Sequence, residues 1–176
     1  MENGFDRSIT DRASNVIEEA VARGITLGCA ESCTGGLVAG ALTAIAGSSD
    51  AFLGGIVSYS NEAKMSILGV PEATLASVGA VSAQTAEAMC EGAARALSAD
   101  ITVSTTGIAG PGGGSDEKPV GTVWFGVHSA QGTRSILHTF EDRGRSAIRE
   151  DAVRVALDLL AREIENIDSA DNVRDA

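Results

Sequence analysis

Hydrophobic residues recur along the chain with two different spacings, which predict alternating helices and strands. Between residues 8 and 23 the apolar positions follow the repeat of an amphipathic helix, and Gly24 is a natural stop. Residues 25–30 form a short apolar run instead, which predicts a strand. The same patterns predict further helices over 37–46, 61–68, 83–97 and 146–164, and further strands over 54–59, 100–109, 120–129 and 134–141.

The order of these segments predicts an α/β protein. Helices that alternate with strands, followed by a hairpin across Ala130-Gln131-Gly132, indicate a mixed sheet between two helical layers, a three-layer α/β/α sandwich. The 176 residues show no repeat and no linker, so we expect a single domain over residues 1–167. The polar, acidic segment 168–176 is expected to be an unstructured tail.

Charge and composition narrow the possible partners. A net charge of −11 disfavours nucleic acid and membrane surfaces, which are themselves anionic. No apolar run reaches the roughly 20 residues that span a bilayer, and the polar N-terminus does not resemble a signal peptide, so we expect a cytoplasmic protein. Three cysteines without a Cys-x-x-Cys pair and two isolated histidines argue against a metal site, and no cofactor is expected. A homodimer is the ordinary expectation for a small enzyme.

Three turns rich in hydroxyl groups and glycine carry the candidate chemistry. The first, AESCTGG, lies where a strand passes into a helix, and backbone N–H groups at such a junction suit an anion. Ser32 and Thr34 add hydroxyl groups, while Gly35 and Gly36 allow a ligand to approach the backbone. An ordinary helix N-cap would show the same residues. Cys33 is interpreted as a buried structural thiol.

The second turn offers a base. Ser48 and Ser49 precede a predicted strand that Tyr59 ends, and Lys64 lies one turn into the following helix. Tyr59 and Lys64 therefore come from one corner and are expected to face one pocket. A lysine acts as a base only when it is neutral, which requires burial or a neighbouring cation.

The third turn ends the third predicted strand, at the edge where open α/β sheets bind ligands. It contains Thr106 and a glycine-rich loop, whose residues permit positive φ angles and a group of N–H donors for an anion. Arg143 and Arg145 precede the last helix and are expected to supply local positive charge. The glycines concerned are Gly107, Gly110, Gly112 and Gly113.

Taken together, these motifs resemble one family over nearly the whole chain. AESCTGG, AGSS at residues 46–49, GGIVSYSNEAK, GAVS at residues 79–82 and TGIAGPGGGSDEKPVGTVWFGV are similar to the CinA C-terminal domain family, the nicotinamide-mononucleotide deamidases. The chain resembles the stand-alone form, without room for the nucleotide-hydrolysing N-terminal domain of many members. The family usually shows Gly-Asp-Arg before the last helix, whereas this chain has Arg143-Gly144-Arg145, so the acidic neighbour of the arginine is replaced.

The resemblance implies an α/β/α fold and hydrolysis of the carboxamide of nicotinamide mononucleotide to nicotinate mononucleotide and ammonia, by metal-free serine-lysine chemistry. Carried over to this sequence, it implies Ser49 as nucleophile, Lys64 as base and Tyr59 beside it. Arg145 would contact the anionic part of the substrate. The other substrate contacts would come from the first and third turns: Ser32, Thr34, Gly35, Gly36, Thr106, Gly107, Gly110, Gly112 and Gly113.

Three alternatives stay open at the level of the sequence. Ser32 is the second choice of nucleophile, and direct attack by water with Lys64 as base is the third possibility. A module that only binds a nucleotide, such as a sensor, would use the same glycine-rich turns without catalysis. The pair of Tyr59 and Lys64 favours the enzyme, because phosphate binding alone does not need it.

Overall fold

The computed structural model describes residues 4–174, with side-chain surroundings for residues 4–167, and confirms the three-layer α/β/α sandwich with a mixed sheet. All predicted helices and strands are present, with ends that differ by a few residues at most positions. The helices are α1 (Arg7–Arg23), α2 (Leu37–Thr43), α3 (Asn61–Leu68), α4 (Glu72–Val78), α5 (Ala83–Leu97) and α6 (Arg145–Arg174), with a 3₁₀ turn η1 (Ser48–Asp50). The strands are β1 (Leu27–Glu31), β2 (Phe52–Val57), β3 (Ile101–Gly107), β4 (Thr122–Ser129) and β5 (Gly132–Thr139).

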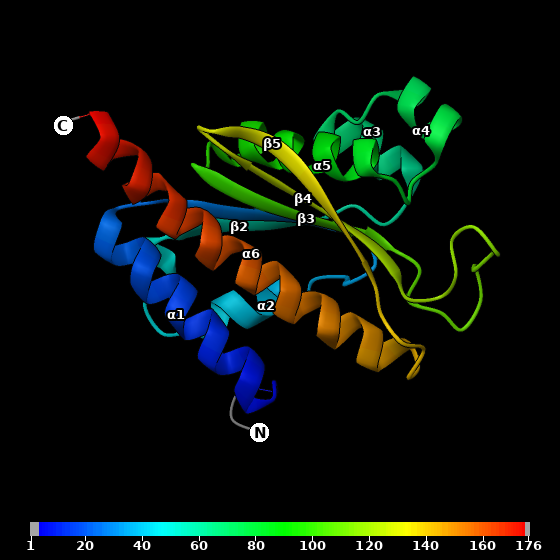
Figure 1. Cartoon of the computed structure of the whole chain (residues 1–176), viewed down its shortest axis with the longest axis horizontal. Helices are drawn as coiled ribbons and strands as arrows, with labels where there is room; N and C mark the ends of the chain where they lie inside the picture. The colour runs from blue at the N-terminus through cyan, green and yellow to red at the C-terminus, as the bar shows by residue number, and fades with distance from the viewer. Residues whose placement is uncertain (1–3, 175–176) are drawn as a thin grey trace.

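The sheet has five strands in the order β2-β1-β3-β4-β5. β1 pairs in parallel with β2 and β3, whereas β4 is antiparallel to both β3 and β5. Figure 1 shows α1, α2 and α6 on one face of this sheet and α3, α4 and α5 on the other. The carboxyl ends of β1, β2 and β3 therefore meet at one edge, which is where ligand sites form in such sheets. None of the described helices is long and apolar enough to cross a membrane.

Two segments differ from the prediction. The helix α4 was not expected, since none of its seven residues is buried and no apolar face marks it in the sequence. The helix α6 continues to Arg174, so the part of the predicted unstructured tail that the structure describes is helical. No glycine or proline interrupts residues 165–174, and extending an existing helix gains a hydrogen bond for each residue added. Residues 175 and 176 lie outside the described residues.

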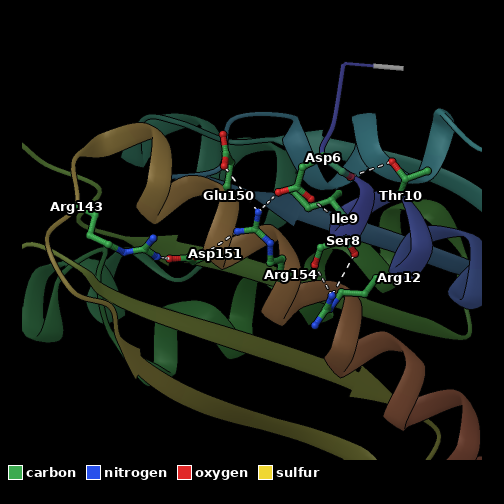
Figure 2. Close-up of polar contacts among 9 residues, drawn as sticks. All are labelled: Asp6, Ser8, Ile9, Thr10, Arg12, Arg143, Glu150, Asp151 and Arg154. Carbon is green, nitrogen blue, oxygen red and sulfur yellow. Dashed lines mark hydrogen bonds and ion pairs between the residues drawn. The ribbon is translucent and has the colours of Figure 1, made fainter. Parts of the chain in front are cut away.

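A network of charged side chains ties the start of α1 to α6. Asp6 caps α1 by accepting a hydrogen bond from the backbone N–H of Ile9 at 2.8 Å, and its second carboxylate oxygen pairs with Arg154. Arg154 also pairs with Asp151, which in turn pairs with Arg143 in the segment before α6 (Figure 2). The network therefore links the N-terminal helix to the turn that carries Arg145.

Asp6 should contribute stability that depends on pH. The hydrogen bond from Ile9 N–H, followed by the contacts with Arg154, lowers the pKa of Asp6. Because its pKa is lower in the folded than in the unfolded chain, this stability is present above the unfolded value and disappears as the pH falls through the folded one. We expect Asp6→Ala to reduce the free energy of unfolding at pH 7 by about 1 kcal/mol, as is typical of a lost N-cap.

Asp6→Asn separates the two contributions, because asparagine still caps the helix but carries no charge. Urea unfolding at a series of pH values should show a smaller loss for Asp6→Asn than for Asp6→Ala at pH 7. The difference between Asp6→Asn and the wild type should vanish once Asp6 is protonated. A difference that is the same at all pH values would rule out the charge as its source.

Candidate active site

The carboxyl ends of the three parallel strands bring the first and second turns together. Glu31, the last residue of β1, pairs with Val57 of β2 on one side and Thr105 of β3 on the other. The next residue in the chain is Ser32, whose backbone N–H donates to Thr105 O at 2.9 Å. The chain after β2 continues through Tyr59 into α3. Ser32 and the residues that follow β2 thus lie side by side.

Lys64 reaches back from the first turn of α3 to this edge. Ser60 caps α3 by accepting a hydrogen bond from Ala63 N–H, which starts the helix four residues before Lys64. The Lys64 ammonium nitrogen donates to Ser58 O at 2.8 Å and lies 3.0 Å from Ser32 Oγ. A weaker contact joins it to Tyr59 O at 3.4 Å. The sequence interpretation that Lys64 and the Tyr59 corner face one site agrees with these contacts.

The Lys64 side chain is only 1% exposed. Within the described part of the chain no carboxylate pairs with it, so its hydrogen-bond partners are a hydroxyl group and carbonyl oxygens. Burial therefore lowers the pKa of Lys64. A lysine in this setting loses its proton at a lower pH than one at the surface, as suits a general base.

Ser49 does not lie near Lys64. It is an exposed residue of η1, before β2 begins, whereas Lys64 contacts the residues that follow the end of β2. The six residues of β2 separate the two positions, which corresponds to about 20 Å along the strand. The structure therefore does not bring together Ser49 and Lys64, which the resemblance pairs, because Ser49 precedes β2 and Lys64 contacts the residues that follow it.

Tyr59 and Arg145 form the outer part of the site. Tyr59 is 62% exposed, and its hydroxyl group accepts a hydrogen bond from Arg145 Nη2 at 2.9 Å. Arg145 Nη1 donates to Gly110 O at 3.0 Å. Arg145 begins α6, so the start of the last helix connects the Tyr59 corner with the glycine-rich loop.

A cavity of about 200 Å³ lies between these groups. Thr106 and Gly107 at the end of β3 form part of its wall, and Thr106 Oγ1 donates to Ala80 O at 2.7 Å. Lys118 stabilises the segment that contains the lining residue Val81 by donating hydrogen bonds to the carbonyl oxygens of Val78 and Val81. The lining residues are Ser32, Cys33, Tyr59, Lys64, Ala80, Val81, Thr106, Gly107, Ala109 and Arg145.

The first turn does not offer its helix N-terminus to a ligand. The buried Glu31 carboxylate accepts hydrogen bonds from the N–H groups of Gly36, Val38 and Ala39 at 2.8–3.1 Å. The anion that the positive end of α2 favours is thus part of the chain itself. Thr34 is also turned inward, with its hydroxyl group 2.7 Å from that of Thr105.

Among the other glycines predicted to contact the substrate, some lie at the cavity and others do not. Gly35 contacts Arg149 rather than the cavity. Gly110 reaches the site through its carbonyl oxygen, which binds Arg145. Gly112 and Gly113 are exposed and are not among the described residues that line the cavity. Of the predicted substrate contacts, the structure therefore brings Ser32, Thr106, Gly107 and Arg145 to one cavity.

Three residues near the site were missed in the sequence. Glu31, Lys118 and Arg149 each satisfy backbone groups of a turn, and their partners are separated from them by five or more residues in the sequence. A signal for Arg149 was present, since it follows Arg145 by four residues and lies on the same side of the helix. Glu31 and Lys118 carry no comparable signal.

Cys33 is buried, as the sequence predicted. Burial raises its pKa to about 11, so its thiol stays protonated at neutral pH and is a poor nucleophile. Among the side chains of residues 4–167, no three from histidine, cysteine or acidic residues are grouped so as to hold a metal ion.

The protein is thus an α/β protein whose candidate active site places a buried lysine beside a serine at the end of a strand. Comparison with known proteins identifies its family. The family model described as "CinA C-terminal domain" matches residues 9–164. The chain therefore belongs to the CinA C-terminal domain family.

Relatives and solved structures agree with this assignment. The chain is 48% identical over 155 residues to the "Nicotinamide-nucleotide amidohydrolase PncC" of Escherichia coli K12, covering 88% of this chain and 94% of that protein. It is 49% identical over 164 residues to a "CinA-like protein" of Synechococcus, covering 93% of this chain. It spans about two fifths of that protein's length (39%). A crystal structure of the "competence/damage inducible protein CihA" from Agrobacterium tumefaciens matches with a TM-score of 0.86 and 46% identity, covering 89% of this chain and 95% of that one.

Proposed function

We propose that the protein hydrolyses the carboxamide of nicotinamide mononucleotide to nicotinate mononucleotide and ammonia, with Ser32 as nucleophile and Lys64 as base. The observation that carries this proposal is the 3.0 Å contact between the Lys64 ammonium nitrogen and Ser32 Oγ, in a cavity where Lys64 is buried without an acidic partner. The similarity to the Escherichia coli nicotinamide-nucleotide amidohydrolase, which extends over nearly the full length of both chains, supports the substrate.

The proposed reaction has two halves. Neutral Lys64 takes the proton of Ser32 while Oγ adds to the amide carbon, whose carbonyl is activated by the electron-withdrawing pyridinium ring. The tetrahedral intermediate then collapses, the C–N bond breaks, and Lys64 returns the proton to the departing ammonia. In the second half Lys64 removes a proton from water, which attacks the ester on Ser32. The C–O bond to Ser32 then breaks, Lys64 returns the proton to Ser32 Oγ, and the nicotinate product is released.

The outer part of the cavity suits the charged end of the substrate. Arg145 lies at its edge and carries a planar guanidinium group, which binds phosphate oxygens well. The hydrogen bond from Arg145 to Tyr59 OH would be exchanged for contacts to the phosphate on binding. Arg145 and Tyr59 are therefore assigned to binding and orientation, and Ser32 and Lys64 to the bond that breaks.

A module that only binds nucleotides fits this arrangement less well. Binding a phosphate or a base does not require a buried lysine that lacks an acidic partner, because an exposed lysine binds anions without a desolvation cost. Direct attack by water, with Lys64 as base, uses the same lysine and is separated from the serine mechanism by substitution of Ser32.

Ammonia release from nicotinamide mononucleotide tests the proposal. The purified protein should release ammonia and nicotinate mononucleotide in equal amounts, at the same rate with and without a chelator. Ammonia can be followed with a coupled assay and the nucleotides by chromatography. No release over a range of pH would refute the function. Loss of activity with chelator, restored by added metal, would refute the serine-lysine chemistry instead.

The cytoplasmic location and the homodimer stay predictions. The family membership is compatible with both, and sedimentation of the purified protein would measure the oligomeric state directly.

A further inference from the structure

We infer that Arg149 is a positioning residue that holds the Ser32 turn against Lys64 by binding two consecutive carbonyl oxygens of that turn. The inference rests on the proposed function and adds to it a residue of α6 that does not touch the cavity. Arg149 Nε donates to Cys33 O at 3.1 Å, and Nη2 donates to Thr34 O at 2.7 Å. The helix α6 thereby reaches 115 residues back along the sequence to the turn that carries Ser32.

The two contacts fix the turn on its downstream side. Each peptide unit is planar, so binding the carbonyl oxygens of Cys33 and Thr34 sets the orientation of two consecutive peptide planes that begin one residue after Ser32. The upstream side is set by Ser32 N–H, which donates to Thr105 O of β3 at 2.9 Å. Ser32 is thus held between a strand on one side and Arg149 on the other.

The sequence of the turn leaves room for this arginine. Gly35 has a φ of +59°, and a Cβ atom there would lie 3.3 Å from Arg149 Nη2. Gly36 has a φ of +94° and gives no side-chain cap to α2. Two consecutive glycines would leave the turn mobile without external contacts. Arg149 supplies these contacts on the carbonyl side, and Glu31 supplies them on the N–H side through Gly36.

The geometry of the contact requires arginine rather than a positive charge alone. The guanidinium group places its N–H donors in one rigid plane, so Nε and Nη2 can reach two neighbouring carbonyl oxygens at once. A lysine nitrogen can bind two carbonyl oxygens only where both converge on one point, as those of Val78 and Val81 do at Lys118. The oxygens of Cys33 and Thr34 are instead bound by two different nitrogens of Arg149. Arg149→Lys therefore keeps the charge and removes the double contact.

The contact has consequences for rate and for the dependence on pH. Arg149 is not among the cavity-lining residues, so its loss should affect the catalytic step more than substrate binding. Ser32 Oγ also accepts a hydrogen bond from the buried Lys64 nitrogen at 3.0 Å. A displaced turn would expose Lys64 to water, and the pKa of Lys64 would rise towards its ordinary value.

Arg149→Lys tests the inference, with Arg154→Lys as a matched control. Arg154 lies on the same helix and binds Asp6 and Asp151 but not the Ser32 turn. We expect Arg149→Lys to lower kcat for nicotinamide mononucleotide about 10- to 100-fold, as misplaced catalytic groups do, with KM changed little. The rise of kcat/KM with pH should move to higher pH. Arg154→Lys should leave kcat and this pH dependence unchanged while lowering thermal stability.

A second measurement separates this inference from the proposed function. A fluorophosphonate probe, followed by peptide mass spectrometry, reports the reactivity of Ser32 without using the nucleotide. The wild type should be labelled at Ser32, and Arg149→Lys should be labelled more slowly at equal folded fraction. If the wild type hydrolyses nicotinamide mononucleotide but Arg149→Lys keeps its kcat, pH profile and labelling rate, the inference is wrong. If the wild type lacks hydrolysis but shows Arg149-dependent labelling, the proposed substrate is wrong and the positioning role stands.

Discussion

Ser32→Ala should abolish ammonia release from nicotinamide mononucleotide, whereas Ser49→Ala should leave it near the wild-type rate. Removal of a nucleophile that acts together with its base costs a factor of at least about a thousand, or about 4 kcal/mol in activation free energy. Ser32 Oγ lies 3.0 Å from the Lys64 nitrogen, whereas Ser49 lies at the opposite edge of the sheet. Initial rates at saturating substrate, with equal circular dichroism spectra for both variants, make the comparison.

Ser49→Ala is the matched control for this experiment. It is the same substitution in an exposed turn, where changes of this size have small effects. A mass increase of the wild type by one nicotinate mononucleotide less one water, trapped by acid quenching and located on Ser32, would identify the ester directly. Near-normal turnover of Ser32→Ala would contradict the nucleophile and favour direct attack by water. Loss of turnover in Ser49→Ala alone would support Ser49 as the nucleophile, as the resemblance implies, and would contradict the proposed pair of Ser32 and Lys64.

The parts of the site that were predicted follow from the direction of the parallel strands. Ser32, Tyr59 and Thr106 each lie near or just after the carboxyl end of a predicted strand, so a shared edge could be expected from the sequence. The same rule places Ser49 at the other edge, because it precedes its strand. The resemblance of the AGSS motif and the direction of the strand therefore point to opposite ends of β2 for the nucleophile.

The parts that were not predicted depend on contacts between distant segments. The rule that a helix N-terminus favours an anion is correct for α2, yet the anion is the Glu31 carboxylate of the chain itself. The sequence alone does not show whether the anion at a helix N-terminus is a side chain of the same protein or a bound ligand. Arg149 and Lys118 bind carbonyl oxygens 115 and 37 residues away. The spacing of Arg149 from Arg145 indicates its side of the helix but not these distant partners.

The fold itself was more accessible, because its buried elements carry clear periodicity. The core helices α1 and α5 show apolar faces, and the strand β3 is buried along nearly its whole length. The helix α4 buries no residue and leaves no such pattern. Surface helices of this kind depend on their caps and on neighbouring segments more than on hydrophobic spacing.

Lys64 should be as necessary as Ser32, and its role should be visible in the dependence of the rate on pH. Lys64→Met and Lys64→Gln should each lower kcat/KM by about 10²- to 10⁴-fold, since neither side chain can accept the proton of Ser32. Glutamine still offers an N–H donor to Ser58 O, so a loss in both variants separates proton transfer from the support of that carbonyl group.

In the wild type, kcat/KM should rise with pH as Lys64 loses its proton and should then level off. Because burial lowers the pKa of Lys64, this rise should occur at a lower pH than an ordinary lysine would give. Lys118, the other lysine of the chain, provides the matched control. Lys118→Met removes two hydrogen bonds to the cavity wall and should raise KM, yet the position of the pH rise should not change. A pH rise that persists in Lys64→Gln at the wild-type position would assign it to another group and contradict Lys64 as the base.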